Sequence, residues 1–353
     1  MASEYIKINR KSRKVLVILA IATLLAAALC MLAGSSRMSI AEMLEALAGR
    51  GSAANVRIMR NIRLPRVLAA LIAGAGLSVS GLIMQTVLGN SMASPSTLGV
   101  SNAAVFGANL SIIAFAGGFL STGNNLSGYM SGTSPYATSA MAFLFSLLSV
   151  LLILALCRIR AFSPNVVVLA GIAIGSVWTA ATTVLQFYAT DVGLSAAVIW
   201  NFGDLGRATY KTDLLMACAV AAGIVYFVLM RWRYNALLSG DVAAKSMGVN
   251  VDRLRFVSLL LASMITAVCV SFLGTIGFVG IICPHLVKKL MGQDHRFVIA
   301  ASAFTGSILL LLADTLSRSI GGGSALPVGA ITSLLGAPFF VAIIFSKGDA
   351  HHD

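Results

Sequence analysis

Long apolar runs are the feature that most restricts what this sequence can fold into. A helix needs about 20 apolar residues to cross the hydrocarbon core of a bilayer, and most of the runs approach or reach that length. The runs are continuous and do not alternate apolar with polar residues, which excludes an outer-membrane β-barrel. Backbone polar groups inside a bilayer must be hydrogen-bonded within the protein, so the runs predict helices. Ten candidate spans cover residues 15–33, 64–86, 97–116, 137–156, 166–190, 213–231, 256–273, 276–290, 297–316 and 326–346.

The remaining residues leave almost no room for a soluble domain. The chain is 58% hydrophobic and 10% charged, whereas soluble domains carry roughly 25% charged residues. We therefore predict an all-α polytopic membrane protein, a bundle of about ten transmembrane helices. Residues 1–14 form a cytoplasmic basic tail, 15–346 the transmembrane domain and 347–353 a second cytoplasmic tail. The first run is longer than the apolar part of a signal peptide, about 7–15 residues, so we expect a retained span.

Basic residues are distributed unevenly around the predicted spans. A net charge of +13 would suggest nucleic acid in a soluble protein, but here we expect no nucleic-acid partner. With the N-terminus inside, sixteen of the 25 basic residues fall inside, as the positive-inside rule requires. This predicts the inner (cytoplasmic) membrane with both termini cytoplasmic. Six arginines between the first two runs break the rule, and they indicate either an acidic partner outside or attraction to lipid headgroups: Arg37, Arg50, Arg57, Arg60, Arg63 and Arg66.

The stretch 235–255, NALLSGDVAAKSMGVNVDRLR, is polar, charged and punctuated by glycine between two long apolar runs. We expect a short helix, a turn and the start of the next span. Asp241 is predicted to cap the short helix by accepting from backbone N–H groups, and Asn250 to cap the following one. Gly248 is predicted to end the short helix in the left-handed conformation. Such a rigid projection suits transmission of force from a soluble partner, and an ordinary cytoplasmic loop is the alternative.

The segment leading into the second span combines apolar and basic signals. Apolar residues in 40–47 have helical spacing, which predicts a short helix on the membrane surface. The motif RLPR follows, and Pro65 suits the first turn of a helix, where its missing N–H costs nothing. Arg63 and Arg66 share a helix face. They are either headgroup anchors or a docking pair.

Small residues mark the second span, and polar residues follow it. Gly74, Gly76 and Gly81 predict close packing against neighbouring helices. The stretch 89–101, GNSMASPSTLGVS, cannot lie against lipid, so we expect irregular backbone that lines protein or a water-filled cavity.

The sequence contains no energy source of its own. Ala244 stands where a nucleotide-binding P-loop needs glycine before Lys245. Ionisable residues are scarce inside the spans, which weakens the case for an ion-coupled carrier. Asp314 is an exception; it is expected to pair locally with Arg318, and an intramembrane acid is a functional hypothesis.

Catalytic and metal-binding groups are equally scarce. An intramembrane enzyme would have only His285 and His295 as bases. Cys283 and His285 do not share a helix face, so no metal site is predicted, and no cofactor is expected. The five cysteines lie in or at the ends of apolar runs without a CxxC pair, which indicates packing residues.

Six segments, in order and at family-like spacing, resemble the FecCD-type iron-siderophore and cobalamin permeases of binding-protein-dependent ABC importers. The match extends from the first span almost to the C-terminus. The chain departs from the family at 90–95, where NSMASP stands in place of the common NPLAxP. Because the first proline is missing, we expect a different backbone shape there. The segments are RLPRVLAALIAGAGLSVSGLIMQ, LGVSNAAVFGA, GDVAAKSMGV, GTIGFVGIICPHLVKKLMGQDHR, LLLADTLSR and LPVGAITSLLGAPFF.

The resemblance implies a type II ABC importer permease architecture and a set of partners. These are a homodimer with the translocation path at its interface, two ATP-binding ABC subunits on the cytoplasmic side and an external substrate-binding protein. The ATPase-coupling residues would be Ser239, Gly240, Asp241, Ala243, Ala244, Met247, Gly248 and Val249. Docking to glutamates of the binding protein would use Arg63, Arg66 and Arg318, and the inner gate would lie at Phe162, Ser163, Pro164 and Asn165.

The function expected from these observations is import of an iron-siderophore-type chelate, driven by a separate ATPase. Permeases for cobalamin or haem share the same motifs, so those cargoes remain alternatives. An ion-coupled secondary transporter and an intramembrane enzyme are the alternatives from other classes.

Overall fold

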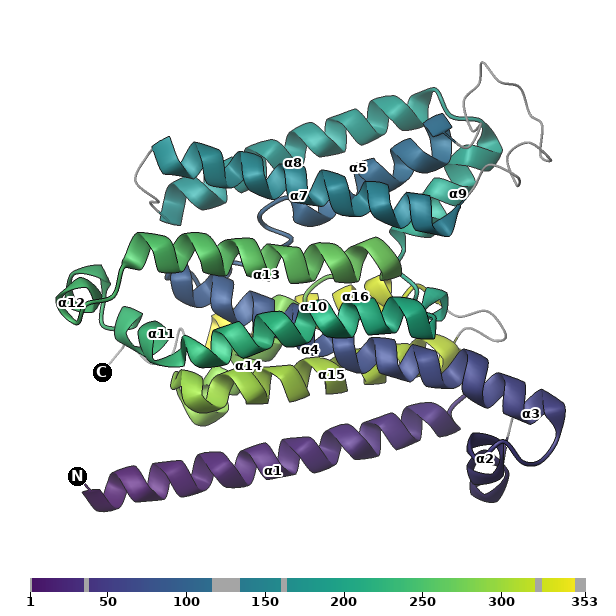
Figure 1. Cartoon of the computed structure of the whole chain (residues 1–353), viewed down its shortest axis with the longest axis horizontal. Helices are drawn as coiled ribbons and strands as arrows, with labels where there is room; N and C mark the ends of the chain where they lie inside the picture. Colours follow the sequence, from purple (N-terminus) through teal and green to yellow (C-terminus); the bar gives the residue numbers. More distant parts are fainter. Residues whose placement is uncertain (1, 35–37, 116–133, 160–163, 321–325, 347–353) are drawn as a thin grey trace.

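The chain folds into a bundle of helices, shown in Figure 1. The structure is a computed structural model, and it describes residues 2–34, 38–115, 134–159, 164–320 and 326–346. Within these ranges the regular structure is helical and no strand occurs, which confirms the predicted all-α class.

Each of the ten predicted apolar runs coincides with a helix. Seven helical stretches are long and apolar enough to cross a membrane by length and composition: α1, the continuous stretch from α3 to α4, α7, α8, α10, α13 and α15. The other three runs form shorter helices, so ten complete crossings remain a prediction. The helices are α1 (Ala2–Leu32), α4 (Leu64–Val87), α5 (Val100–Asn109) continued by the π-helical η2 (Leu110–Phe115), α7 (Pro135–Ile159), α8 (Pro164–Phe187), α10 (Tyr210–Leu229), α13 (Val251–Leu273), α14 (Val279–Met291), α15 (His295–Ile320) and α16 (Val328–Ser346).

Short helices connect the long ones. The predicted surface helix at 40–47 is present as α2, and its N-terminus carries a capping box between Ser39 and Glu42. Helix α9 was not predicted. The short elements are α2 (Ile40–Leu47), α3 (Ala53–Arg57), the π-helical η1 (Ile58–Arg63), α9 (Asp191–Asn201), the 3-10 turn η4 (Leu205–Arg207), α11 (Arg231–Leu237) and α12 (Asp241–Ser246).

The helices form two groups on either side of α13 (Figure 1). Helices α5 and α7 contact α13 on one side, and α8 packs against both of them. Helices α4 and α10 contact α13 on the other side, α14 and α15 pack against α4, and α1 lies along α15. The end of the bundle that carries α11, α12 and the start of α1 is named the coupling end. The opposite end, which carries α2, α3 and the first turns of α4, is named the arginine end.

Two glycine contacts hold α4 against its neighbours at very close range. A Cβ atom at Gly81 would lie 1.8 Å from the carbonyl oxygen of Gly280 in α14, and one at Gly74 would lie 2.5 Å from that of Gly306 in α15. Only glycine permits this approach, because any side chain would force the helices apart. The predicted role of the small residues of α4 in close packing is confirmed.

Pro65 lies in the first turn of α4, as predicted. The helical path does not begin there, because the π-helical η1 runs into α4 and the stretch from Ala53 to Val87 is continuous. A proline inside a helix lacks the N–H for the i−4 carbonyl, and its ring collides with that carbonyl. The wider π-turn Ile58–Arg63 lies directly before the proline, where the regular hydrogen-bond pattern is interrupted.

Candidate functional site

At the coupling end, α12 projects between two glycines that adopt positive φ angles. Gly240 has φ 94° and precedes the helix, whereas Gly248 has φ 81° and follows it. The predicted left-handed conformation of Gly248 is confirmed. Asn250 caps α13, since its side-chain oxygen accepts from the backbone N–H of Arg253 at 3.0 Å, also as predicted. Local turn chemistry therefore fixes both limits of the projection.

The prediction for Asp241 was wrong. Gly240 is the N-cap residue of α12, and Asp241 is the first residue of the helix. Its carboxylate instead accepts two hydrogen bonds from the guanidinium of Arg255, at 2.7 and 2.8 Å. Arg255 also donates from Nε to the carbonyl of Val87 at the end of α4, 2.8 Å away. One buried arginine thus ties α12 to α13 and α4.

The outer face of the α12 segment is exposed and carries apolar side chains beside the polar Lys245 and Ser246. Val242 is 84% exposed and Met247 is 60% exposed, while Ala244 points inward and is buried. Exposed apolar side chains on a short rigid helix are a surface suited to contact with another protein. Val242 and Met247 are the exposed apolar side chains that this segment offers to a partner.

His295, one of the two candidate bases, lies at the start of α15 and is buried. Its ring nitrogens lie 2.8 Å from Thr86 Oγ1 and 2.9 Å from Asn235 Oδ1. Asn235 also donates to Asp294 at 2.9 Å. Burial alone would raise the pKa of Asp294, but hydrogen bonds from Arg296 and Asn235 outweigh it, so the pKa lies below its usual value. These contacts link α4, α11 and α15.

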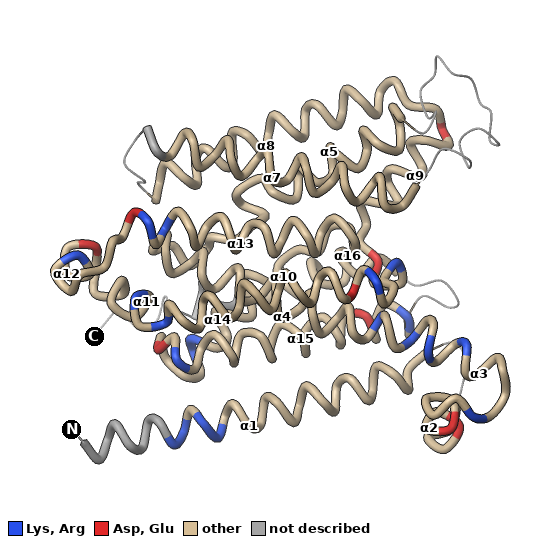
Figure 2. The backbone as a smooth tube through the Cα atoms, viewed as in Figure 1, with Lys and Arg blue, Asp and Glu red and all other residues tan. Residues whose placement is uncertain are grey.

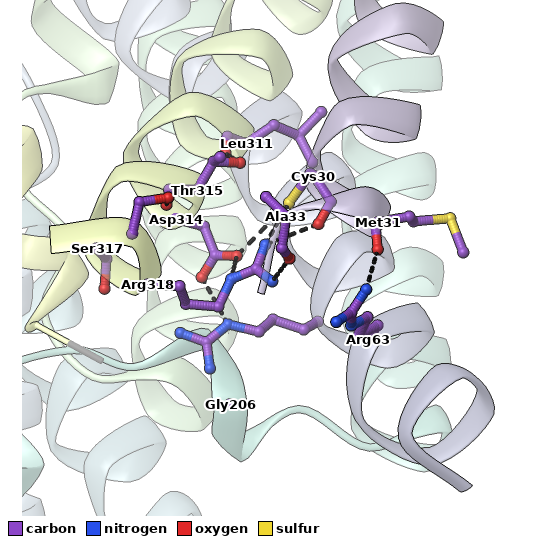
Figure 3. A network of polar contacts seen from close by, with 12 residues as sticks. Cys30, Met31, Ala33, Arg63, Gly206, Leu311, Asp314, Thr315, Ser317 and Arg318 are labelled. Carbon is purple, nitrogen blue, oxygen red and sulfur yellow. Dashed lines mark hydrogen bonds and ion pairs between the residues drawn. The ribbon is translucent and has the colours of Figure 1, made fainter. Parts of the chain in front are cut away.

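At the arginine end, Asp314 is the centre of a buried polar network (Figure 3). Its side chain is fully buried in α15, and its carboxylate accepts from Nε of Arg66 at 2.6 Å and from Nε of Arg318 at 3.0 Å. The predicted local pair of Asp314 with Arg318 is therefore confirmed. Arg66 is also within ion-pair distance of Asp204, at 3.2 Å, without hydrogen-bond geometry.

The end of α1 completes this network. Arg318 donates to the carbonyls of Cys30 and Ala33 and to Cys30 Sγ, and Arg63 donates to the carbonyl of Met31 at 2.7 Å. Guanidinium groups thus hold the exposed carbonyls at the C-terminal end of α1. No sequence signal marks Cys30 or Asp204 as members of this network, because the tertiary fold brings both of them in.

The three predicted docking arginines come together but are largely buried. Arg63 is 4% exposed and Arg66 is 8% exposed. Arginines from the 50–60 segment cover this end and are exposed: Arg50, Arg57 and Arg60. Figure 2 shows charged residues gathered at the two ends of the bundle, with few along its length. Docking through Arg63, Arg66 and Arg318 remains a prediction.

Between the two ends, two cavities are lined by uncharged residues. The larger, about 660 Å³, lies between α8 and the 90–102 segment. The second, about 440 Å³, is lined by residues from α5, α16 and the loops after α9 and α13. Both cavities include Ser96 and Asn102 in their lining. The prediction that the polar segment after α4 is irregular and lines a cavity is confirmed.

The predicted inner gate lies at the start of α8. Phe162 and Ser163 fall outside the described residues, whereas Pro164 begins α8 and Asn165 is exposed. Among the residues that the structure describes, no group of three His, Cys, Asp or Glu side chains is placed to hold a metal ion.

Membrane-length helices with charged residues gathered at the two ends define a multi-pass membrane protein. The model of the FecCD transport family matches residues 19–346, so the chain belongs to that family. An ABC transporter permease protein of Methanocaldococcus jannaschii is 44% identical over 93% of each chain. The hemin transport system permease protein HmuU of Yersinia pestis is 35% identical over 82% of this chain and 84% of its own.

A solved structure shows the same architecture. An inward-facing metal-chelate type ABC transporter has a TM-score of 0.81 at 26% identity, covering 95% of this chain and 99% of that one. The fold is that of a type II importer permease.

Proposed function

We propose that this chain is the permease subunit of an ABC importer for an iron-siderophore-type chelate, located in the cytoplasmic membrane with both termini inside. Relatives in its family are named for hemin, iron(3+)-hydroxamate and vitamin B12 import. Two copies would form the translocation path, an external binding protein would deliver the chelate, and two ATP-binding subunits would supply the energy. The observation that carries the proposal is α12, a braced helix with exposed apolar side chains in a chain of this family.

The coupling end would transmit the motion of the ATPase subunits. The proposed contact segment runs from Ser239 to Val249, with Val242 and Met247 as its exposed apolar contacts. Arg255 joins this segment to two long helices, so a force on α12 reaches α13 and α4 directly. Asn165 and its neighbours at the start of α8 are proposed as the gate on the same side.

The arginine end would receive the binding protein. Arg63, Arg66 and Arg318 are proposed as the docking centre, and the exposed arginines around them would attract an acidic partner. An ion pair with that partner would have to share guanidinium groups with Asp314 and the carbonyls at the end of α1.

The test is ATP-driven uptake in proteoliposomes. The chain reconstituted with its ATPase and binding protein should accumulate the chelate only with ATP. A Val242→Asp variant should lose most uptake, because a charge replaces the apolar side chain that is proposed to be buried against the ATPase. Gln293→Glu, which adds the same charge at an exposed position of the same end outside this segment, is the control. Uphill accumulation by the chain alone, driven by an ion gradient, would overturn the proposal in favour of a secondary transporter.

A further inference from the structure

A third cavity, about 640 Å³, lies at the coupling end, where several helices begin or end. Its lining includes Gln85 and Thr86 from the last turn of α4, Leu237 at the end of α11 and Gly240 directly before α12. The volume is within the range of small-molecule sites, about 300–1,000 Å³. Unlike the two cavities between the ends, this one has charged side chains in its lining.

Cations outnumber carboxylates around this cavity. Arg255 contributes from the start of α13, and Lys288 and Lys289 contribute from the last turn of α14. Asp241 is the one carboxylate among the described lining residues, and both of its oxygens accept from Arg255. Neither lysine is within ion-pair distance of an acidic side chain in the part of the chain that the structure describes. The two lysines therefore bring positive charge without a direct counterion.

Lys288 is turned inward and held there. Its ammonium donates to Oε1 of Gln85 at 3.0 Å, and Nε2 of Gln85 donates to the carbonyls of Gly280 and Ile281 at 3.3 and 3.4 Å. An ammonium has three hydrogens, so two of them stay uncommitted. A lysine that served only to anchor the end of α14 would extend its ammonium to water instead.

Arg255 supplies a second set of donors in a fixed position. It is 7% exposed, and it donates to the carbonyl of Val87 and to both carboxylate oxygens of Asp241. A guanidinium has five hydrogens, so one on each terminal nitrogen is left over. Donors that are held in place before a ligand arrives lower the entropic cost of binding it.

This set of donors suits a phosphate group. A phosphate monoester carries charge close to −2 and three strong acceptor oxygens. Lysine binds such a group as a point charge, and arginine binds it through its planar fork. A neutral or cationic molecule in the cavity would leave both lysines without a counterion.

Two further features indicate the depth of phospholipid headgroups. Trp232 in α11 is 58% exposed, and exposed tryptophan is typical of the membrane–water interface. Leu237 and Leu238, at the end of the same helix, line the cavity together with the cationic side chains. An anionic headgroup with its glycerol and acyl carbons matches both kinds of surface, whereas a soluble phosphate matches the cationic part alone.

We infer that this cavity binds a phosphate group, carried by an anionic phospholipid or by a soluble phosphate, through Lys288, Lys289 and Arg255. Gly240 and Asp241 also line the cavity, so a bound phosphate would lie against the start of α12. The inference concerns the chain alone and does not rest on the proposed function.

Isothermal titration calorimetry on the purified full-length chain in non-ionic detergent tests the inference. One probe is dihexanoylphosphatidylglycerol, which is anionic, and a second is dihexanoylphosphatidylcholine, which has the same phosphodiester beside a cation. The third is inorganic phosphate. The wild type should bind phosphatidylglycerol, inorganic phosphate or both, and should bind phosphatidylcholine about tenfold more weakly. Binding of phosphatidylglycerol without inorganic phosphate would identify a headgroup site, and comparable or tighter binding of inorganic phosphate a site for soluble phosphate.

The lysines of the cavity are tested one at a time. Lys288→Gln should weaken binding of the anionic probe about tenfold, since it removes a charge-assisted hydrogen bond. Lys289→Gln, at an exposed position where folding is not at risk, should weaken it about threefold. Lys14→Gln is the matched control, because this exposed lysine lies near the start of α1 and outside the cavity. It should leave the affinity unchanged.

Four results would overturn the inference. They are no binding of either phosphatidylglycerol or inorganic phosphate, equal binding of the two short-chain lipids, binding of acetate as tight as that of the anionic probe, and unchanged affinity in both variants of the cavity. An equal loss in Lys14→Gln would also contradict it, since anions would then be attracted to the whole coupling end and not to a site.

Discussion

The two ends of the bundle are both held by arginine–aspartate pairs, yet they present different surfaces. At the arginine end, Asp314 is fully buried and serves two arginines, so the charges face inward. At the coupling end, the carboxylate of Asp241 is 45% exposed and serves Arg255 alone, while apolar side chains face outward.

The two ends also differ in how many helices their ion pairs join. The network around Asp314 joins α1, α4 and α15, so a change there would move three long helices together. The pair at Asp241 holds a short helix between Gly240 and Gly248, the two residues with positive φ that frame it. The first arrangement makes a scaffold, and the second makes a projection with defined limits that can move as a unit.

Removing the charge of Asp314 should have the largest effect on stability. Asp314→Asn keeps the shape but leaves Arg66 and Arg318 without a shared buried counterion, and breaking a buried pair costs about 3–5 kcal/mol. Thermal unfolding of the purified chain should show a marked loss. Asp191→Asn, at an exposed carboxylate in the first turn of α9, should change little. Similar midpoints for the two variants would contradict the scaffold role of the arginine end.

A substitution at Gly248 should have an intermediate effect on stability and a larger one on coupling. A valine at φ 81° is strained by about 1–2 kcal/mol, and it would displace the turn from α12 into α13. Gly248→Asn is the matched control, because asparagine tolerates the left-handed region. We expect uptake per ATP hydrolysed to fall sharply for Gly248→Val and mildly for Gly248→Asn. Normal coupling in the valine variant would show that the position of α12 is unimportant.

The helices could be predicted from the sequence because lipid leaves little choice. Every apolar run coincides with a helix, since backbone groups in a bilayer must pair within their own segment. Local rules also predicted the conformations at Gly248 and Asn250, which depend on neighbouring residues only. Helix α9 was missed although Thr190 caps it and Asp191 stands in its first turn, because its eleven residues are too few to be recognised as a span.

The partners of the charged side chains could not be predicted in the same way. A carboxylate at the start of a helix can bind backbone N–H groups or a distant guanidinium, and only the fold decided that Asp241 binds Arg255. Arg66 meets Asp314 across 248 positions of sequence. The burial of Arg63 and Arg66 has the same origin, because the end of α1 and the η4 turn cover them. The hydrogen bond from Asn102 to Thr179 likewise joins residues 77 positions apart.

Charge reversal at an exposed arginine should have the smallest effect on stability of these substitutions. It also tests most directly whether the binding protein approaches the arginine end and not the coupling end. Arg57 lies at the end of α3 and is exposed, so Arg57→Glu should leave thermal unfolding within about 0.5 kcal/mol of the wild type. An acidic binding protein would nevertheless approach a weaker positive field, and its association rate at low salt should fall by about tenfold.

The control for this reversal lies at the coupling end. Arg233→Glu changes the same charge at an exposed site there and should leave the association rate unaltered. Surface plasmon resonance of the immobilised chain against its binding protein gives both rates. Because screening acts over about 10 Å at 0.1 M salt, the gap between Arg57→Glu and the wild type should close as salt rises. A gap that persists at high salt would show that Arg57 makes a direct contact, and equal effects of the two variants would mean that the binding protein does not approach the arginine end.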